Sequence, residues 1–207
     1  MPKISFVYFD VGGVLIRDFS DSDKWSKMLH DMGFKDADVP AFDIIYDEFE
    51  KQVCEGKYHV DELVPRIVKE FNLSISPDFS MQKYFVEHFD KNVELWALIK
   101  KLAKTTKVGL LTGQYPGLLN DIRAAGLFDF DNWSAVIDTS IEGINKPDPR
   151  IYRIAEARTE LPAKEILFVD NREKNLIPAR ELGWQTFLYD SRDYRRASSD
   201  LSKFLGL

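Results

Sequence analysis

The chain has 207 residues and a formal net charge of −6 at pH 7, enough length for one packed core with an inserted segment. No apolar run is long enough to cross a membrane, and the N-terminal stretch lacks the cleavage site of a signal peptide, so we expect neither a membrane protein nor a secreted one. Cys54 is the one cysteine, which excludes an intramolecular disulfide and favours a reducing, cytoplasmic location. Residues 18–90 carry 17 acidic against 8 basic side chains, which argues against nucleic-acid binding.

The first predicted element is a buried strand that ends in a carboxylate. Residues 4–9 are almost all apolar, and a run without polar alternation is typical of a strand covered on both faces of a parallel sheet. Asp10 follows, and then Gly12 and Gly13 allow a tight turn whose backbone N–H groups can approach an anion. Ligands bind at the carboxyl ends of such strands, so Asp10 is a candidate nucleophile or metal ligand. A turn-forming aspartate explains this segment alone equally well.

Residues 18–90 have the spacing of helices and contain no convincing strand. Their apolar side chains recur at helical intervals over residues 25–32, 42–53, 63–71 and 81–88. An insertion directly after the first strand lies over the strand ends, so we predict a helical-bundle cap that excludes water and selects the substrate. The predicted domains are this cap, residues 18–90, and a core formed by residues 1–17 and 91–207.

From residue 92 onward, helices alternate with short buried strands. The predicted strands cover residues 107–112, 135–137, 166–169 and 185–189. Asn92 is predicted to cap the helix that follows it, and Asp148 to cap a helix with Pro149 at its first position. This order predicts an α/β fold with a doubly wound, Rossmann-like parallel sheet.

Four polar side chains stand where the predicted strands and loops reach one edge of the sheet. Asp10, Thr112 and Asp170 each end a strand, and Lys146 precedes a helix. One carboxylate can attack phosphorus, the hydroxyl can hold a phosphate oxygen, the lysine can balance charge, and the second carboxylate can bind Mg²⁺. Alone, Lys146 is more often a surface residue and Thr112 more often a turn residue, but the combination of the four predicts phosphoryl transfer.

These segments resemble the haloacid dehalogenase-like (HAD) hydrolase superfamily. The matching motifs are Phe9–Leu15, Leu110–Gly113, Asn145–Tyr152 and Phe168–Asn175. The run Asn-Lys-Pro-Asp-Pro-Arg-Ile-Tyr is the most specific of them, and the helical insertion is similar to the C1 type of cap. Within the superfamily, the chain most resembles the branch of bacterial α-glucose-1-phosphate phosphatase, which also carries Gly two residues after the nucleophile.

The resemblance implies how the phosphoryl group is handled. Asp10 would be the nucleophile and would form an aspartyl-phosphate. Thr112 would bind the phosphoryl group, and Lys146 would neutralise it and orient Asp10. The phosphate site would be completed by Gly12, Gly13 and Gly113.

The resemblance also implies Mg²⁺ as cofactor, held by Asp10, the backbone carbonyl of Gly12, Asp170 and Asn171. Asn171 stands where the family commonly has a second acid. Its amide oxygen can coordinate a metal but carries no negative charge, so we expect weaker Mg²⁺ binding than usual. Asn175 would brace the metal loop through its amide.

Gly12 is a second departure from the family pattern. Most family phosphatases carry an Asp there, which protonates the leaving alcohol and then activates the hydrolytic water. General acid–base catalysis contributes about 10²–10⁴-fold in rate, so without a substitute the site would be slow on poor leaving groups. A water or a cap residue would have to take this role, and the sequence does not identify which.

Three functions are open at this point. The leading one is an Mg²⁺-dependent phosphatase of a small phosphate monoester, such as a sugar phosphate or a similar metabolite. The second is a catalytically weakened relative that binds a phosphorylated ligand or regulates, which Gly12 and Asn171 favour and the retained site residues oppose. The third is a 2-haloacid dehalogenase, which needs no metal; there Asp170 would repel the anionic substrate.

Overall fold

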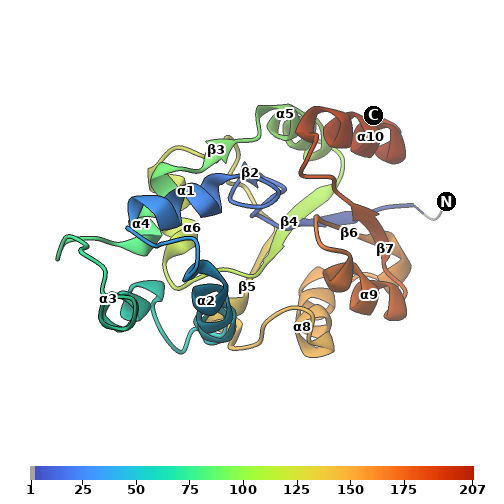
Figure 1. The fold of residues 1–207 in the computed structure, drawn as a ribbon. Helices are drawn as coiled ribbons and strands as arrows, with labels where there is room; N and C mark the ends of the chain where they lie inside the picture. Colours follow the sequence, from blue (N-terminus) through green and yellow to red (C-terminus); the bar gives the residue numbers. More distant parts are fainter. Residues whose placement is uncertain (1–2) are drawn as a thin grey trace.

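The computed structural model describes residues 3–207, and its centre is a five-stranded, fully parallel sheet (Figure 1). The strands are β1 (Phe6–Phe9), β4 (Lys107–Thr112), β5 (Ala135–Asp138), β6 (Ile166–Asp170) and β7 (Gln185–Leu188). Their order is β5-β4-β1-β6-β7, so the chain winds outward from β1 in both directions. The predicted α/β fold with a doubly wound parallel sheet is confirmed.

Helices cover both faces of this sheet because successive side chains of each buried strand point to opposite sides. On β1, Phe6 and Tyr8 belong to one apolar cluster, and Val7 and Phe9 to the other. The first cluster is completed by α8 (Pro149–Thr159) and α9 (Glu173–Glu181), the second by α5 (Val93–Leu102), α6 (Leu118–Ala124) and α10 (Tyr194–Leu205). The strands therefore form the middle of three layers, which leaves only their ends accessible to a ligand.

The segment between β1 and α5 is helical, as its spacing predicts. It holds α1 (Lys24–Asp31), α2 (Val39–Cys54), the short 3-10 helix η1 (Val60–Leu63), α3 (Val64–Glu70) and α4 (Met81–Glu87). These helices gather at one end of the molecule, beyond the sheet (Figure 1). We call residues 18–90 the cap segment; its limits as a separate domain stay a prediction.

A two-stranded ladder at the base of the cap segment was not predicted. Strands β2 (Ile16–Arg17) and β3 (Asp90–Lys91) pair antiparallel, with Ile16 opposite Lys91 and Arg17 opposite Asp90. Two residues are too few to give an alternating pattern, so sequence periodicity could not reveal them. Both crossings of the chain between the sheet and the cap segment pass through this ladder.

The two predicted helix caps differ in outcome. The Asp148 side chain accepts from the backbone N–H of Arg150 at 2.9 Å, and Pro149 is the first helical residue, as predicted. Asn92 stands at the N-cap of α5 but makes no capping hydrogen bond. Its fully buried amide instead donates to the carbonyl of Val14 at 2.6 Å and to the hydroxyl of Tyr189 at 2.9 Å. Asn92 thus connects the loop after β1 to the residue following β7.

Within residues 3–207, none of the helices combines the length and apolar character required to span a bilayer.

We expect Asn92→Ala to lower the free energy of unfolding by about 1–3 kcal/mol, because it leaves the Val14 carbonyl and the Tyr189 hydroxyl short of a buried donor. Urea unfolding followed by circular dichroism measures this change. The exposed Asn120→Ala is the matched control and should change stability little. Equal stability of the two variants would show that the Asn92 bonds contribute nothing net.

Candidate active site

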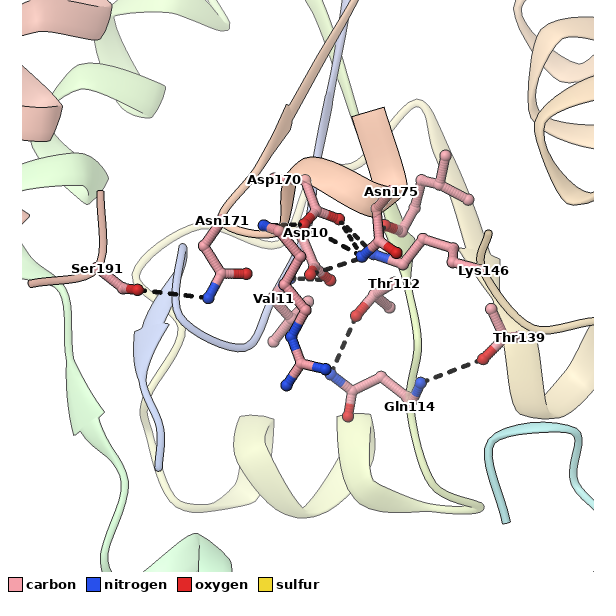
Figure 2. A network of polar contacts seen from close by, with 12 residues as sticks. Asp10, Val11, Thr112, Gln114, Thr139, Lys146, Asp170, Asn171, Asn175 and Ser191 are labelled. Atoms are coloured by element: carbon pink, nitrogen blue, oxygen red, sulfur yellow. Dashed lines mark hydrogen bonds and ion pairs between the residues drawn. The ribbon is translucent and has the colours of Figure 1, made fainter. Parts of the chain in front are cut away.

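The candidate site lies where β1, β4 and β6 end side by side. Phe9 is paired with Leu110 of β4 and with Val169 of β6, so the residues that follow emerge at one edge (Figure 2). Asp10, Thr112 and Asp170 therefore meet, as the sequence predicts. Asp10 is 8% exposed, and Thr112 and Asp170 are fully buried. Parallel pairing alone brings together groups that are about 60 to 160 residues apart in sequence.

Lys146 enters this edge from the loop before α8 and bridges the two carboxylates. Its Nζ lies 2.7 Å from Oδ2 of Asp170 and 3.1 Å from Oδ2 of Asp10, and it donates to the carbonyl of Leu111 at 3.3 Å. Burial lowers the pKa of Lys146, but Asp10 and then Asp170 outweigh that effect and raise it above its usual value. The lysine is therefore a fixed positive charge, as the predicted role requires.

Opposing effects act on the pKa of the Asp10 carboxyl. Burial raises its pKa most, Lys146 lowers it, and the nearby Asp170 raises it again, to about 6 in total. The backbone N–H of Val11 donates to Oδ1 at 2.8 Å, which favours the ionised form. An ionised Asp10 is thus available near neutral pH, although its charge is stabilised less than in water.

Asp170 is oriented by donors on both of its oxygens. The backbone N–H of Arg172 donates to Oδ1 at 2.7 Å, and Nδ2 of Asn175 lies 3.2 Å from Oδ1 and 3.0 Å from Oδ2. The Asn175 amide thus contacts the predicted metal ligand Asp170, while its bracing of a metal loop stays a prediction. Such second-layer contacts fix a carboxylate in one orientation, which a metal ligand requires.

The Gly12–Gly13 turn passes beneath Asn171. Gly13 has φ +70°, and a Cβ at that residue would lie 2.1 Å from Nδ2 of Asn171, so only glycine fits. That Nδ2 donates to Ser191 at 3.4 Å, and the Ser191 hydroxyl donates to Asp21 at 2.5 Å. With its nitrogen turned toward Ser191, Asn171 presents its oxygen on the side of Asp10 (Figure 2).

Gln114 is a site residue that sequence reasoning missed. It is 3% exposed, its Nε2 donates to the Thr112 hydroxyl at 3.1 Å, and its backbone N–H donates to Thr139 at 3.3 Å (Figure 2). Between them Gly113 packs closely, because a Cβ there would lie 3.3 Å from Oδ1 of Asn145. The Thr112 hydroxyl is thereby fixed beside Asp10, where its hydrogen bond lowers the pKa of the Asp10 carboxyl.

The cap segment reaches the site through a chain of hydroxyl contacts. The hydroxyls of Tyr46 on α2 and Tyr115 after β4 lie 2.5 Å apart, and Tyr115 donates to Glu50 at 2.8 Å. Burial raises the pKa of both tyrosines well above the usual value, so both stay protonated. These contacts close the cap segment over the loop that follows β4.

Two further charged groups border the site. Desolvation of the guanidinium lowers the pKa of Arg172, but the carboxylates of Glu50, Asp10 and Asp18 outweigh that effect and raise it. Asp18 packs against Gly12, and burial raises the pKa of its carboxyl while hydrogen bonds from Ser20 oppose the rise. Arg172 lies within the motif Phe168–Asn175. No motif or spacing indicates Asp18, because it approaches the site only when the chain is folded.

The residues predicted to hold Mg²⁺ form an oxygen-only set. Asp10 and Asp170 supply two carboxylates, and the adjoining chain segments supply the amide oxygen of Asn171 and the carbonyl of Gly12. Hard cations prefer such oxygens. Within residues 3–207, no three His, Cys, Asp or Glu side chains form a metal-binding group, so a metal held at this edge would also need an amide or a carbonyl oxygen. The oriented Asn171 oxygen meets that requirement.

Comparison with known proteins identifies the family. Residues 4–183 match the family described as haloacid dehalogenase-like hydrolase. The chain belongs to this family. The HAD enzyme BT-2542 of Bacteroides thetaiotaomicron superposes with a TM-score of 0.76 at 19% identity, over 98% of each chain. The L-2-haloacid dehalogenase of Xanthobacter autotrophicus, solved with chloropropionic acid covalently bound, gives 0.63 at 18% identity over 88% of this HAD chain and 76% of its own.

Among curated proteins, bifunctional epoxide hydrolase 2 of Rattus norvegicus is 34% identical over 170 residues. The match covers 75% of this HAD chain but 30% of the rat protein. Two other curated relatives are covered over still less of their length, 7% and 13%. The relationship therefore concerns one part of each of these longer proteins.

We expect Asp10→Asn to stabilise the folded protein without metal by about 1–3 kcal/mol near pH 7. The folded pKa of about 6 exceeds the value of 3.8 for an unperturbed carboxyl. The folded state then binds more protons than the unfolded state between these values, so stability falls as pH rises through them. Thermal unfolding in EDTA should show a higher Tm for the variant at neutral pH and a smaller gap near pH 5.

Asp23→Asn, at an exposed carboxylate paired with Lys27, is the control and should leave Tm nearly unchanged. A lower Tm for Asp10→Asn than for the parent would mean that the bond to Lys146 outweighs the cost of burying the charge.

Proposed function

We propose that the protein is an Mg²⁺-dependent phosphatase that hydrolyses a small phosphate monoester through an aspartyl-phosphate on Asp10. The observation that carries this proposal is the buried Lys146 ammonium, in contact with both Asp10 and Asp170 beside the Thr112 hydroxyl. One site thus provides an oriented nucleophile, a fixed positive charge and a hydroxyl donor, the groups that in-line phosphoryl transfer uses.

Each group then has one task. An oxygen of Asp10 attacks phosphorus while the bond to the leaving oxygen breaks. Thr112, Lys146 and the backbone N–H groups after Asp10 and Thr112 hold the equatorial oxygens, whose charge grows in the transition state. Water then attacks the aspartyl-phosphate, releases phosphate and restores the carboxylate.

The donor set fits Mg²⁺, and Asp10, the Gly12 carbonyl, Asp170 and Asn171 would hold it. When bound, the metal supplies positive charge against the repulsion between the carboxylates and the phosphate. The need for it follows from the site itself, since one lysine faces two carboxylates and a dianionic substrate adds more negative charge. The BT-2542 enzyme, solved in complex with magnesium and inorganic phosphate, offers a parallel within the fold.

The dehalogenase alternative has support from fold similarity, because L-2-haloacid dehalogenases are among the structural neighbours. Against it, Asp170 is a second buried carboxylate within reach of the same lysine as Asp10. A metal-free site for an anionic haloacid would have to bring that substrate toward two carboxylates. We therefore place phosphate ester hydrolysis first, and halide release remains the observation that would reverse this order.

The partner that follows is a small phosphorylated metabolite, a sugar phosphate or a compound of similar size. The Tyr46–Tyr115 contact closes the cap segment beside the site, so a compact leaving group is favoured over a polymer. The cytoplasmic location remains part of the proposal, consistent with a single buried cysteine.

Phosphate release should require Mg²⁺ and disappear in Asp10→Asn. The test uses p-nitrophenyl phosphate and a panel of sugar phosphates, with Mg²⁺ or EDTA, and a 2-haloacid in parallel. Loss of the nucleophile should reduce kcat by a factor of about 10³ or more. Release that persists in Asp10→Asn would exclude this nucleophile, and halide release without phosphate release would favour the dehalogenase. Binding of phosphate ligands with no turnover at all would favour the weakened, regulatory relative.

Asn171→Asp should bind Mg²⁺ more tightly, because it adds a negative charge to the donor set. We expect the Mg²⁺ concentration for half-maximal activity to fall several-fold, with Ser191→Ala as the companion variant. Ser191→Ala removes the acceptor that orients the Asn171 amide and should raise that concentration. Unchanged Mg²⁺ dependence in both variants would remove Asn171 from the metal site.

A further inference from the structure

The space beside Gly12 is filled by a carboxylate from another part of the chain. A Cβ built on Gly12 would lie 2.4 Å from Oδ2 of Asp18 and 3.4 Å from its Cγ. The Asp18 carboxyl group therefore occupies the place from which a side chain at position 12 would start. Gly12 is two residues after the nucleophile, so this carboxyl group borders the turn that carries Asp10.

The segment around Asp18 is held in place from several sides. Its Oδ1 accepts from the backbone N–H of Ser20 at 2.8 Å. The Cβ of Ser20 in turn would lie 3.3 Å from a Cβ built on Gly13, so this segment packs against the Gly12–Gly13 turn. Arg17, the preceding residue, pairs with Glu94 at 2.7 Å and lies in the β2–β3 ladder. A group on an anchored segment keeps its position relative to the nucleophile, which proton transfer requires.

The structural contact of Asp18 is local, the hydrogen bond from the backbone N–H of Ser20 to Oδ1. Among the residues that the structure describes, it joins no ion pair; the nearby Lys24 instead binds Asp90 at 2.8 Å and the Arg17 carbonyl at 2.9 Å. A partly buried carboxylate without an ion-pair partner costs stability. The position of this carboxylate beside the loop that carries the nucleophile points to a role in the reaction.

We propose that Asp18 is the general acid and base of this enzyme, in place of the acid missing at position 12. The inference rests on the proposed phosphatase function. As the phosphorus–oxygen bond breaks, the protonated Asp18 gives its proton to the leaving oxygen and becomes a carboxylate. That carboxylate then takes a proton from the water that attacks the aspartyl-phosphate, which returns Asp18 to its first state and releases phosphate.

The test compares esters with good and poor leaving groups, using the intact chain with Mg²⁺. Asp18→Asn should lower kcat/KM for a sugar phosphate by about 10²–10⁴-fold, because an alkoxide leaves only with a proton. With p-nitrophenyl phosphate, whose leaving group needs no proton, it should release about one nitrophenolate per active site in a burst and then turn over slowly. The burst marks an aspartyl-phosphate that forms but lacks its base for hydrolysis.

A swap variant keeps the test independent of folding losses. Gly12→Asp combined with Asp18→Ala places a carboxylate at position 12 in the room that Asp18 leaves, and should recover much of the sugar phosphate activity. Gly12→Asp alone should lower the activity of the parent, because its Cβ displaces Asp18. Asp23→Asn is the matched surface control and should match the parent on both esters.

The role of Asp18 would be overturned, with the phosphatase intact, if Asp18→Asn lowered activity equally on both esters and showed no burst, and if the double variant recovered no activity. Full sugar phosphate activity in Asp18→Asn would do the same. A parent enzyme that hydrolyses neither ester would overturn the proposed function itself, and the inference with it.

Discussion

The rest of the structure depends on one ammonium group that joins the ends of three strands. Lys146 contacts Asp10 after β1, the Leu111 carbonyl in β4 and Asp170 at the end of β6. It is buried almost completely, so the surrounding medium screens these charges little. Removing it would leave two carboxylates facing each other without compensation, a strongly unfavourable arrangement in a protein interior. The geometry of the strand ends and the charge balance of the site are therefore set by the same contacts.

Lys146 balances only one of the two negative charges, and the surrounding polar groups stabilise the other. Backbone N–H groups of Val11 and Arg172 and the amide of Asn175 all donate to the two carboxylates. These are short-range, fixed donors, which suits a protein whose overall charge is −6 and whose cap segment is acidic. An anion is thus recognised by local geometry, since the long-range field of the molecule does not attract it.

The sequence predicted what is encoded in contiguous runs. The buried strands, the helices of the cap segment and the meeting of Asp10, Thr112, Lys146 and Asp170 all follow from apolar runs and from motifs at their ends. What it could not predict arises between remote segments. Asp18 beside Gly12 depends on the path of the chain after β2, and Asn92 binds Val14 and Tyr189 only because α5 returns next to the first loop. Local sequence makes a capping role for Asn92 reasonable, and tertiary contacts provide stronger partners.

The β2–β3 ladder has a mechanical consequence. Because both covalent crossings run through four paired residues, the cap segment is tethered along one border only. Its opposite border is held by side-chain contacts: Tyr46 with Tyr115, and Gln82 on α4 with Asp121 on α6 at 2.8 Å. This arrangement favours a rotation of the cap segment about the ladder, which would separate the opposite border first. The strand ends would then open from the Tyr115 side, while Asp18, next to the axis, would move least.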